Sequence, residues 1–327
     1  MTLPWAALLA AAAGAAAGSG GTLLVVEKAA ERLSAYDAAT GQALWGVGVG
    51  HKPHELAVSP DRSTAYVTNY GVDSFTSEGP GDKVITVVDL KRRQKSGEID
   101  LGDSRRPHGI EVGASGRLYV TADQPARLLV VDPVKREVVR RFELGQSLPH
   151  MLAVSRDERR AYTANSGSGT VSVLALDGEG AAPLRQIEIG GIPQGFAWSE
   201  DGRRLFVTNR SGNTLFAIDP ARDEITARVV IPGQPARLRA VPGGPYLLVS
   251  LIDAGDAAVV DTRTMEVVGR THACGRAEAI TADPAGHFGY IACQADPGVV
   301  LRFSIPDAKP VLEIKTAGKP DPLVVLP

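Results

Sequence analysis

The chain has 327 residues, of which 44% are hydrophobic and 5% aromatic, and its formal net charge is −2. This length exceeds that of an ordinary domain but suits one large all-β domain. The slightly negative charge and the few aromatic side chains argue against nucleic acid as a partner. The 36 glycines and 22 prolines are spread along the whole chain, which indicates many tight turns rather than one disordered segment.

The first predicted element is a targeting segment. Residues 5–17 are uncharged and rich in Ala and Leu, and Ala15-Ala16-Ala17 offers a small-residue cleavage site. The stretch is shorter than the roughly 20 residues that span a bilayer. We therefore expect a signal peptide at residues 1–18, a single exported domain at 19–327 that is periplasmic or secreted from a bacterium, and no transmembrane segment. The alternative is a loose Ala-rich tail, because no Lys or Arg precedes Lys28.

Strand-like runs follow at residues 23–27, 32–37 and 43–49, and then a block of Pro, an apolar residue three places later, a turn and a strand begins to repeat. The block starts at Pro53, Pro107, Pro149, Pro193, Pro235, Ala277 and Pro320. Steps of 42–54 residues with short β segments are typical of propeller blades of four strands.

The block from Pro193 shows one complete blade, with strands predicted at 194–199, 204–209, 214–219 and 225–230. The last block, residues 320–326, supplies only an inner strand, whereas the N-terminal runs lack one. Joined together, these two parts complete a blade and remove the open sheet edges. We therefore predict an all-β, seven-bladed β-propeller with four antiparallel strands per blade and a composite N-/C-terminal blade, and we expect a monomer.

Two segments carry a resemblance to a known family. Tyr66-Val67-Thr68-Asn69 is the YVTN motif, Phe206-Val207-Thr208-Asn209 is close to it, and Leu56 to Asp61 matches the family's inner strand and turn. Over residues 22–327 the chain resembles the YVTN-repeat, or YncE-like, propellers. The resemblance implies the seven-bladed fold, and it implies little about function, since related propellers include lactonases, lyases and domains of copper or quinone enzymes.

The position after the repeat Pro carries the main functional signal. Equivalent positions of consecutive blades form a ring around the channel, and here they are His54, His108, His150, Gln194, Ala236, Glu278 and Asp321. Imidazole titrates near neutral pH and is the commonest metal ligand. Three histidines with a carboxylate or water match a zinc or copper site. Together with Arg105, Arg106 and Arg237 near the same rim, the ring also suits an anionic small molecule; a third interpretation is a purely structural repeat.

The longest insertion, residues 70–83, lies between the second and third strands of the first full blade and opens on the same face as His54. Long loops on a rigid scaffold often carry binding residues. We interpret this one as a wall or lid of the site, with Tyr70 and Phe75 as contacts, or as a tolerated surface insertion. The second-strand ends Asn69, Asp123, Asn165 and Asn209 fit turn capping.

Cys274 and Cys293 are the two cysteines. Cys274 precedes the inner strand of its blade and Cys293 ends the next strand, so antiparallel pairing brings both to one rim. In an oxidising compartment they can form a disulfide if their Cα atoms come within roughly 7 Å. The alternative places His272 and Cys274 in a metal site.

Two functions therefore remain open. The first is an exported binding module that holds an anionic small molecule or a partner protein at the His-rich channel mouth. The second is a metal-dependent, lactonase-like hydrolase or lyase in which zinc or copper is held by the same histidines. No nucleophile or dedicated base stands out, although Glu55, Glu278 and Asp321 are candidates, so we favour the first and do not expect an enzyme.

Overall fold

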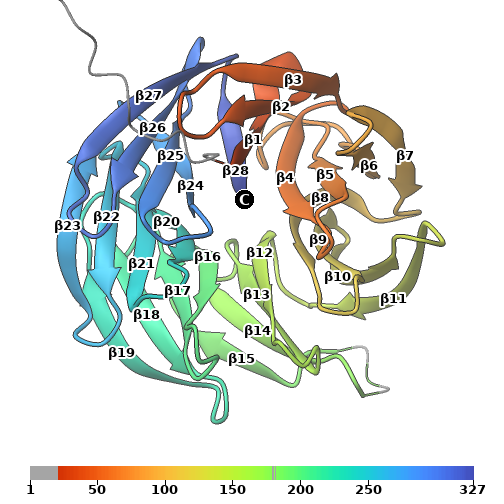
Figure 1. Cartoon of the computed structure of the whole chain (residues 1–327). Coiled ribbons are helices and arrows are strands. Elements are labelled where there is room, and N and C mark those ends of the chain that lie inside the picture. Colours follow the sequence, from red (N-terminus) through yellow and green to blue (C-terminus); the bar gives the residue numbers. More distant parts are fainter. Residues whose placement is uncertain (1–20, 179, 181) are drawn as a thin grey trace, which may run out of the picture.

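The computed structural model describes residues 21–178, 180 and 182–327, and the predicted signal peptide lies outside this range. Seven four-stranded antiparallel sheets surround a central channel, each with its first strand innermost, which confirms the predicted seven-bladed propeller (Figure 1). We number the blades from β4 onward, so that blade 7 is the composite one. The one described helix is a single 3-10 turn, η1 (Lys28–Ala30), and no described helix is long and apolar enough to cross a membrane.

The strands of blades 1 to 3 are β4 (Pro53–Val58), β5 (Thr64–Asn69), β6 (Val84–Asp89), β7 (Gln94–Asp100), β8 (Arg105–Val112), β9 (Leu118–Gln124), β10 (Ala126–Asp132), β11 (Glu137–Glu143), β12 (Pro149–Val154), β13 (Arg160–Asn165), β14 (Thr170–Ala175) and β15 (Arg185–Glu188). Those of blades 4 to 6 are β16 (Pro193–Trp198), β17 (Leu205–Asn209), β18 (Thr214–Asp219), β19 (Glu224–Val230), β20 (Pro235–Ala240), β21 (Tyr246–Leu251), β22 (Asp256–Asp261), β23 (Glu266–His272), β24 (Ala277–Ala282), β25 (Phe288–Cys293), β26 (Gly298–Ser304) and β27 (Pro310–Thr316). Blade 7 contains β28 (Pro320–Leu326), β1 (Thr22–Glu27), β2 (Arg32–Asp37) and β3 (Ala43–Gly48).

The composite blade closes the ring as predicted. β28 pairs with β1 in antiparallel register from Thr22 opposite Leu326 to Glu27 opposite Pro320, so the C-terminal strand lies innermost beside the channel (Figure 1). Apolar residues fill both faces of this blade, and successive residues of β1 pack into the clusters on its two sides, as a sheet buried on both faces requires. Pairing with β28 covers the inner edge of β1, which would otherwise be open.

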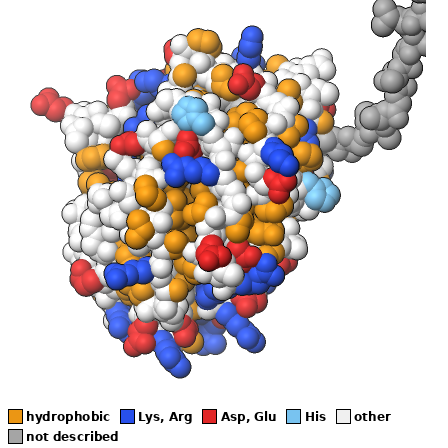
Figure 2. All heavy atoms as spheres, turned by 90° about the vertical axis from the view of Figure 1, so that its left-hand side faces the viewer, with side chains coloured by type: hydrophobic (Ala, Val, Ile, Leu, Met, Phe, Trp, Pro, Cys, Tyr) orange, Lys and Arg blue, Asp and Glu red, His pale blue; other side chains and the backbone are white. Residues whose placement is uncertain are grey.

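The hydrophobic core lies between neighbouring blades rather than in one centre. The middle strands β5 and β9, for example, send Tyr66 and Val120 into a common apolar cluster that joins blades 1 and 2. The outer wall carries charges of both signs scattered among apolar side chains, as Figure 2 shows for one side. The ring positions predicted from the sequence lie away from this wall, where the inner strands begin.

Candidate functional site

The starts of the inner strands are held by threonines of the second strands, including the Thr of the YVTN motif. Thr68 donates its hydroxyl to the main-chain oxygen of His108 in the next blade, at 2.9 Å, and accepts the N–H of Glu55 at 3.0 Å. Thr121 makes the same contact to the oxygen of His150, at 2.6 Å. Each inner strand also has a register shift at this point, as between Pro53 and Leu56. Blades 1 and 2 thus each fix the backbone of the ring position in the next blade.

The three ring histidines lie against one another. The ring centroids of His54 and His108 are 4.0 Å apart, those of His108 and His150 are also 4.0 Å apart, and the planes are tilted by 45° and 41°. Tyr70 packs edge-on against the first two, with its centroid 5.3 Å from His54 and 5.6 Å from His108. The symmetry of the repeat therefore gathers three imidazoles into one stack.

Each of these imidazoles has a nitrogen without a partner. The Nδ1 atoms of His54, His108 and His150 are buried and have no hydrogen-bond partner among the described residues. The same holds for Oε1 of Gln194, which occupies the ring position of blade 4. Native structures leave few buried polar atoms unpaired, so such a group is a candidate for binding a ligand or an ion.

The environment keeps the imidazoles neutral. Burial lowers the pKa of His54, His108 and His150 well below the usual value. Nearby positive charge adds to this effect, since Lys28 and Arg237 lower the pKa of all three. A neutral imidazole has one lone pair and one N–H, so it can ligate a metal, accept a hydrogen bond or donate one.

A cavity of about 390 Å³ lies above this stack. Five of the seven predicted ring residues border it, namely His54, His108, His150, Gln194 and Glu278. Tyr70 and Phe75 of the insertion also border it. Three cations stand around the same space, namely Lys28, Arg210 and Arg276.

Asp123 adds a carboxyl group to the wall of this cavity. It accepts a hydrogen bond from the hydroxyl of Tyr70. Burial raises the pKa of Asp123 to about 6, with Tyr70 and Arg106 acting in the opposite direction. The cavity therefore contains one carboxyl group that titrates close to neutral pH, which is a common property of functional sites.

Three of the predicted ligand residues do not border this cavity. Arg106 is 4% exposed and donates to the main-chain oxygens of Phe75, Ser77 and Gly79, at 3.2, 2.7 and 2.6 Å, so it anchors the insertion from below. Arg237 lies further down the channel, where it donates to Glu55. Asp321 is fully buried and accepts from Lys28 at 2.8 Å and from Gln294 at 3.1 Å. These three positions follow from bonds that the spacing of the repeat does not reveal.

One group of possible metal donors occurs among the described residues, and it differs from the predicted set. One donor atom each of His54, Glu55 and His108 lie within 4.8 Å of one another, whereas His150 is not part of the group. Nδ1 of His54 is 3.7 Å from Oε1 of Glu55, which is too long for a hydrogen bond. The carboxylate of Glu55, one residue beyond the ring position, thus takes the place expected for a third histidine.

The ring position after the repeat Pro does not account for all the cavity residues, and of those in a second ring only Tyr70 was predicted. The residue directly after each second strand forms a second ring at the same rim. Five of these residues border the cavity: Tyr70, Ser166, Arg210, Gln294 and Lys28. The repeat spacing that identified the first ring could have identified this one as well.

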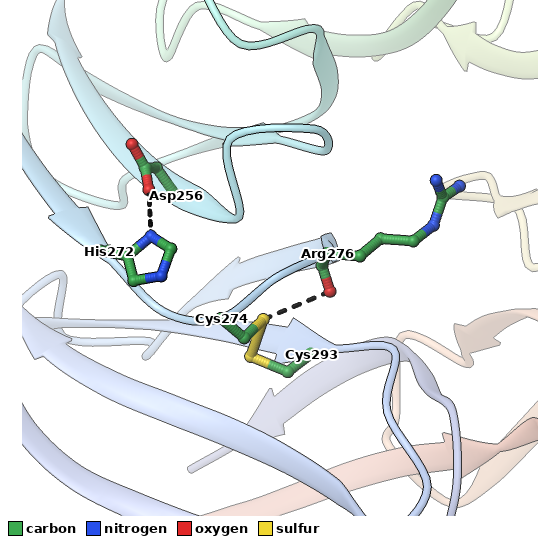
Figure 3. The surroundings of a disulfide bond; sticks show 5 residues. All are labelled: Asp256, His272, Cys274, Arg276 and Cys293. Atoms are coloured by element: carbon green, nitrogen blue, oxygen red, sulfur yellow. Dashed lines mark hydrogen bonds and ion pairs between the residues drawn. A yellow bond between two sulfur atoms is a disulfide. The ribbon is translucent and has the colours of Figure 1, made fainter.

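Cys274 and Cys293 are joined by a disulfide with their Cα atoms 6.0 Å apart. Figure 3 shows that this bond lies at the base of the segment from which Arg276 extends, with the sulfur of Cys274 3.2 Å from the main-chain oxygen of Arg276. His272 instead contacts Asp256, with 2.8 Å between Nδ1 and Oδ1. The cysteines therefore brace a wall of the cavity, and His272 takes no part in it.

No protein-family model and no curated protein matches the chain. Among solved structures, it is similar to hydrazine synthase from Kuenenia stuttgartiensis, with a TM-score of 0.71 and 19% identity over 84% of this chain and 90% of that one. It is also similar to the dihydro-heme d1 dehydrogenase NirN, with a TM-score of 0.62 and 15% identity over 94% of this chain and 76% of that one. A functionally unknown protein from Desulfotomaculum acetoxidans is similar with a TM-score of 0.74 and 14% identity over 94% of this chain and 99% of that one. At these identities the likeness shows the seven-bladed fold alone.

Proposed function

We propose that this chain is an exported propeller of the YVTN-repeat type that binds a small acidic organic molecule in the His-lined cavity. The single observation that carries the proposal is the lining of that space: three neutral imidazoles on its floor and Lys28, Arg210 and Arg276 around it. Its volume of about 390 Å³ falls in the usual range for small-molecule pockets, so we favour a small ligand over a partner protein.

The contacts of the cations define the kind of ligand. Arg210 is held by the side chain of Gln234 at 2.8 Å and lies 3.9 Å from Asp253, and Arg276 lies 3.7 Å from Glu278. These contacts leave guanidinium N–H groups free to meet a carboxylate at the cavity mouth. Imidazole N–H groups and the edge of Tyr70 would then meet the uncharged part of the ligand.

The export and family proposals have separate support. Residues 1–18 have the composition of a signal peptide, and a disulfide such as Cys274–Cys293 persists in an oxidising compartment. Thr68 of the Tyr66–Asn69 motif donates a hydrogen bond to the main chain of the next blade, so the motif helps to join neighbouring blades. Cleavage is tested by mass spectrometry of the protein recovered from a periplasmic extract.

The binding proposal is tested by calorimetry with a panel of small mono- and dicarboxylates. Arg276→Ala should weaken the best ligand by about 10-fold or more, since a hydrogen bond to a charged group contributes roughly 1.5–3 kcal/mol. His108→Ala should weaken it by about 2- to 10-fold, since a hydrogen bond between neutral groups contributes roughly 0.5–1.5 kcal/mol. His272→Ala is the matched control, because this histidine is exposed and lies outside the cavity. Equal affinity of the His108→Ala protein and the unaltered protein would refute the proposal.

A metal-dependent hydrolase or lyase is the second candidate, and the grouping of His54, Glu55 and His108 is the observation that favours it. These residues would hold the cation, and a bound cation would polarise a carbonyl of the ligand. Elemental analysis of protein purified without chelator tests this candidate. Stoichiometric zinc or copper that is lost in a His54→Ala/His108→Ala variant, but kept in His272→Ala, would support the enzyme; metal-free protein after zinc loading would exclude it.

A further inference from the structure

A second cavity lies deeper in the channel. Its volume is about 360 Å³, and it shares no lining residue with the His-lined cavity. Its walls come from the later parts of the seven inner strands, from β4 to β28. We call it the inner cavity. Only Glu55 and Arg237 of its lining were candidate site residues from the sequence, because the lining residues fall outside the ring position.

An ion pair in the wall of the inner cavity spans the channel. Arg237 of β20 donates through Nη2 to Oε1 of Glu55 of β4, and the two side chains are 7% and 6% exposed. The second terminal nitrogen of Arg237, Nη1, is buried and has no partner among the described residues. Arg237 borders the inner cavity, so this unpaired N–H group lies close to it.

A second guanidinium group follows on the same strand. Arg239 also borders the inner cavity, and its side chain has no hydrogen bond or ion pair to any described residue. Its side chain is exposed to solvent, so the guanidinium group is accessible to a ligand. An accessible arginine without a carboxylate partner is free to hold an anion by charge-assisted hydrogen bonds.

The remaining wall is mostly apolar and includes two large aromatic side chains. Leu56, Ile110, Leu152, Leu238, Ile280 and Leu323 line it together with Phe196 and Trp198. The acids in the wall are Glu55, which is engaged by Arg237, and Glu111, which accepts the N–H of Val154 at 3.0 Å. The inner cavity thus combines two cationic donors on one strand with apolar side chains from all seven inner strands.

We propose that the inner cavity binds an organic monocarboxylate with an apolar body, whose carboxylate is held between Arg237 and Arg239. The apolar body lies along the leucines and Trp198. A monoanion fits better than a phosphate dianion, because the carboxyl groups of Glu55 and Glu111 stand in the same wall and would repel the second charge. This site is independent of the proposed ligand of the His-lined cavity, since the two spaces share no residue.

The test is calorimetry of the full chain with octanoate, and with butanoate, octanol and octylammonium as comparison ligands. We expect octanoate to bind at least 10-fold more tightly than each of the other three, because only octanoate carries both the anion and the long apolar body. Trp198 borders the cavity, so its fluorescence should change on titration with octanoate. Equal binding of octanol would overturn the proposal, as would no detectable binding of octanoate at millimolar concentration.

Variants locate the site. Arg239→Ala should weaken octanoate binding at least 10-fold, and Arg239→Gln, which retains a polar side chain of similar length, should weaken it as well. Arg228→Ala is the matched control, since Arg228 is exposed on the outer strand β19. His108→Ala should leave octanoate affinity unchanged, which separates this site from the His-lined cavity. Unchanged affinity in Arg239→Ala, or a loss in His108→Ala alone, would refute the assignment.

Discussion

The buried pair of Glu55 and Arg237 offers the sharpest test of how the channel is held together. Two unit charges roughly 3 Å apart attract by about 5 kcal/mol at an effective dielectric constant near 20. Removing one partner of a buried pair typically costs about 3–5 kcal/mol, because the other charge stays buried alone. We therefore expect Glu55→Gln and Arg237→Met each to destabilise the fold by that amount at pH 8, and the double variant to recover most of the loss.

The assay is reversible thermal or urea unfolding, evaluated as a double-mutant cycle. For a chain of this size about 1 kcal/mol shifts the melting temperature by roughly 1.5–2 °C, so each single variant should melt about 5–10 °C lower. Arg237 lowers the pKa of Glu55 and burial raises it. Without Arg237 the carboxyl takes up a proton more readily, so Arg237→Met should cost less at pH 5 than at pH 8. A coupling energy below about 1 kcal/mol at pH 8 would refute the reasoning.

Three further predictions concern the walls of the site. Arg106→Ala should speed amide hydrogen exchange in residues 71–83 at least 10-fold, because it removes three charged hydrogen bonds to the insertion, while exchange in β17 stays unchanged. Burial raises the pKa of Asp123 from 3.8 to about 6, so the stability that its protonated carboxyl contributes is present below pH 4 and is lost as the pH rises through about 6. Asp123→Asn should flatten this part of the curve of unfolding free energy against pH. An unaltered curve would contradict the assignment. Replacing Cys274 and Cys293 by Ser removes a disulfide between residues 19 positions apart. The loss of this loop constraint should lower the free energy of unfolding by about 3 kcal/mol and the melting temperature by about 5 °C. If dithiothreitol leaves the melting temperature of the unaltered protein unchanged, the bond is not formed.

The fold could be predicted from the sequence because each blade repeats the same local signals. Pro193 to Val230 contains four runs of alternating or β-branched residues between turn residues, and the structure places β16 to β19 within one residue of the predicted bounds. The composite blade could also be predicted, since the count of strands at the two ends is complementary. Repetition makes the prediction strong because every blade tests it again.

The side-chain contacts of the site could be predicted only in part. Repeat symmetry placed His54, His108 and His150 side by side, because equivalent backbone positions must be neighbours around the axis. It could not show that Arg106 turns toward the insertion, since the loop carbonyls that hold it belong to a segment without a repeat. It also could not show the pairing of Arg237 with Glu55, which joins residues 182 positions apart across the channel. Contacts that break the symmetry depend on side-chain direction, and the spacing of a repeat does not encode that direction.

The ring histidines impose a stability cost that the fold itself does not require. Thr68 and Thr121 hold the main chain of the ring position in the next blade, so the backbone there does not depend on the side chain. Ala236 occupies the same position in blade 5, fully buried and without any polar side-chain atom, which shows that this position accepts a small apolar residue. A buried polar atom without a partner costs about 1–3 kcal/mol, so three unpaired imidazole nitrogens cost roughly 3–9 kcal/mol, a sum comparable with the whole stability of a typical domain. A ligand or ion that satisfies these nitrogens would return that free energy on binding, which is the physical reason to expect the stack to be a binding surface rather than a packing element.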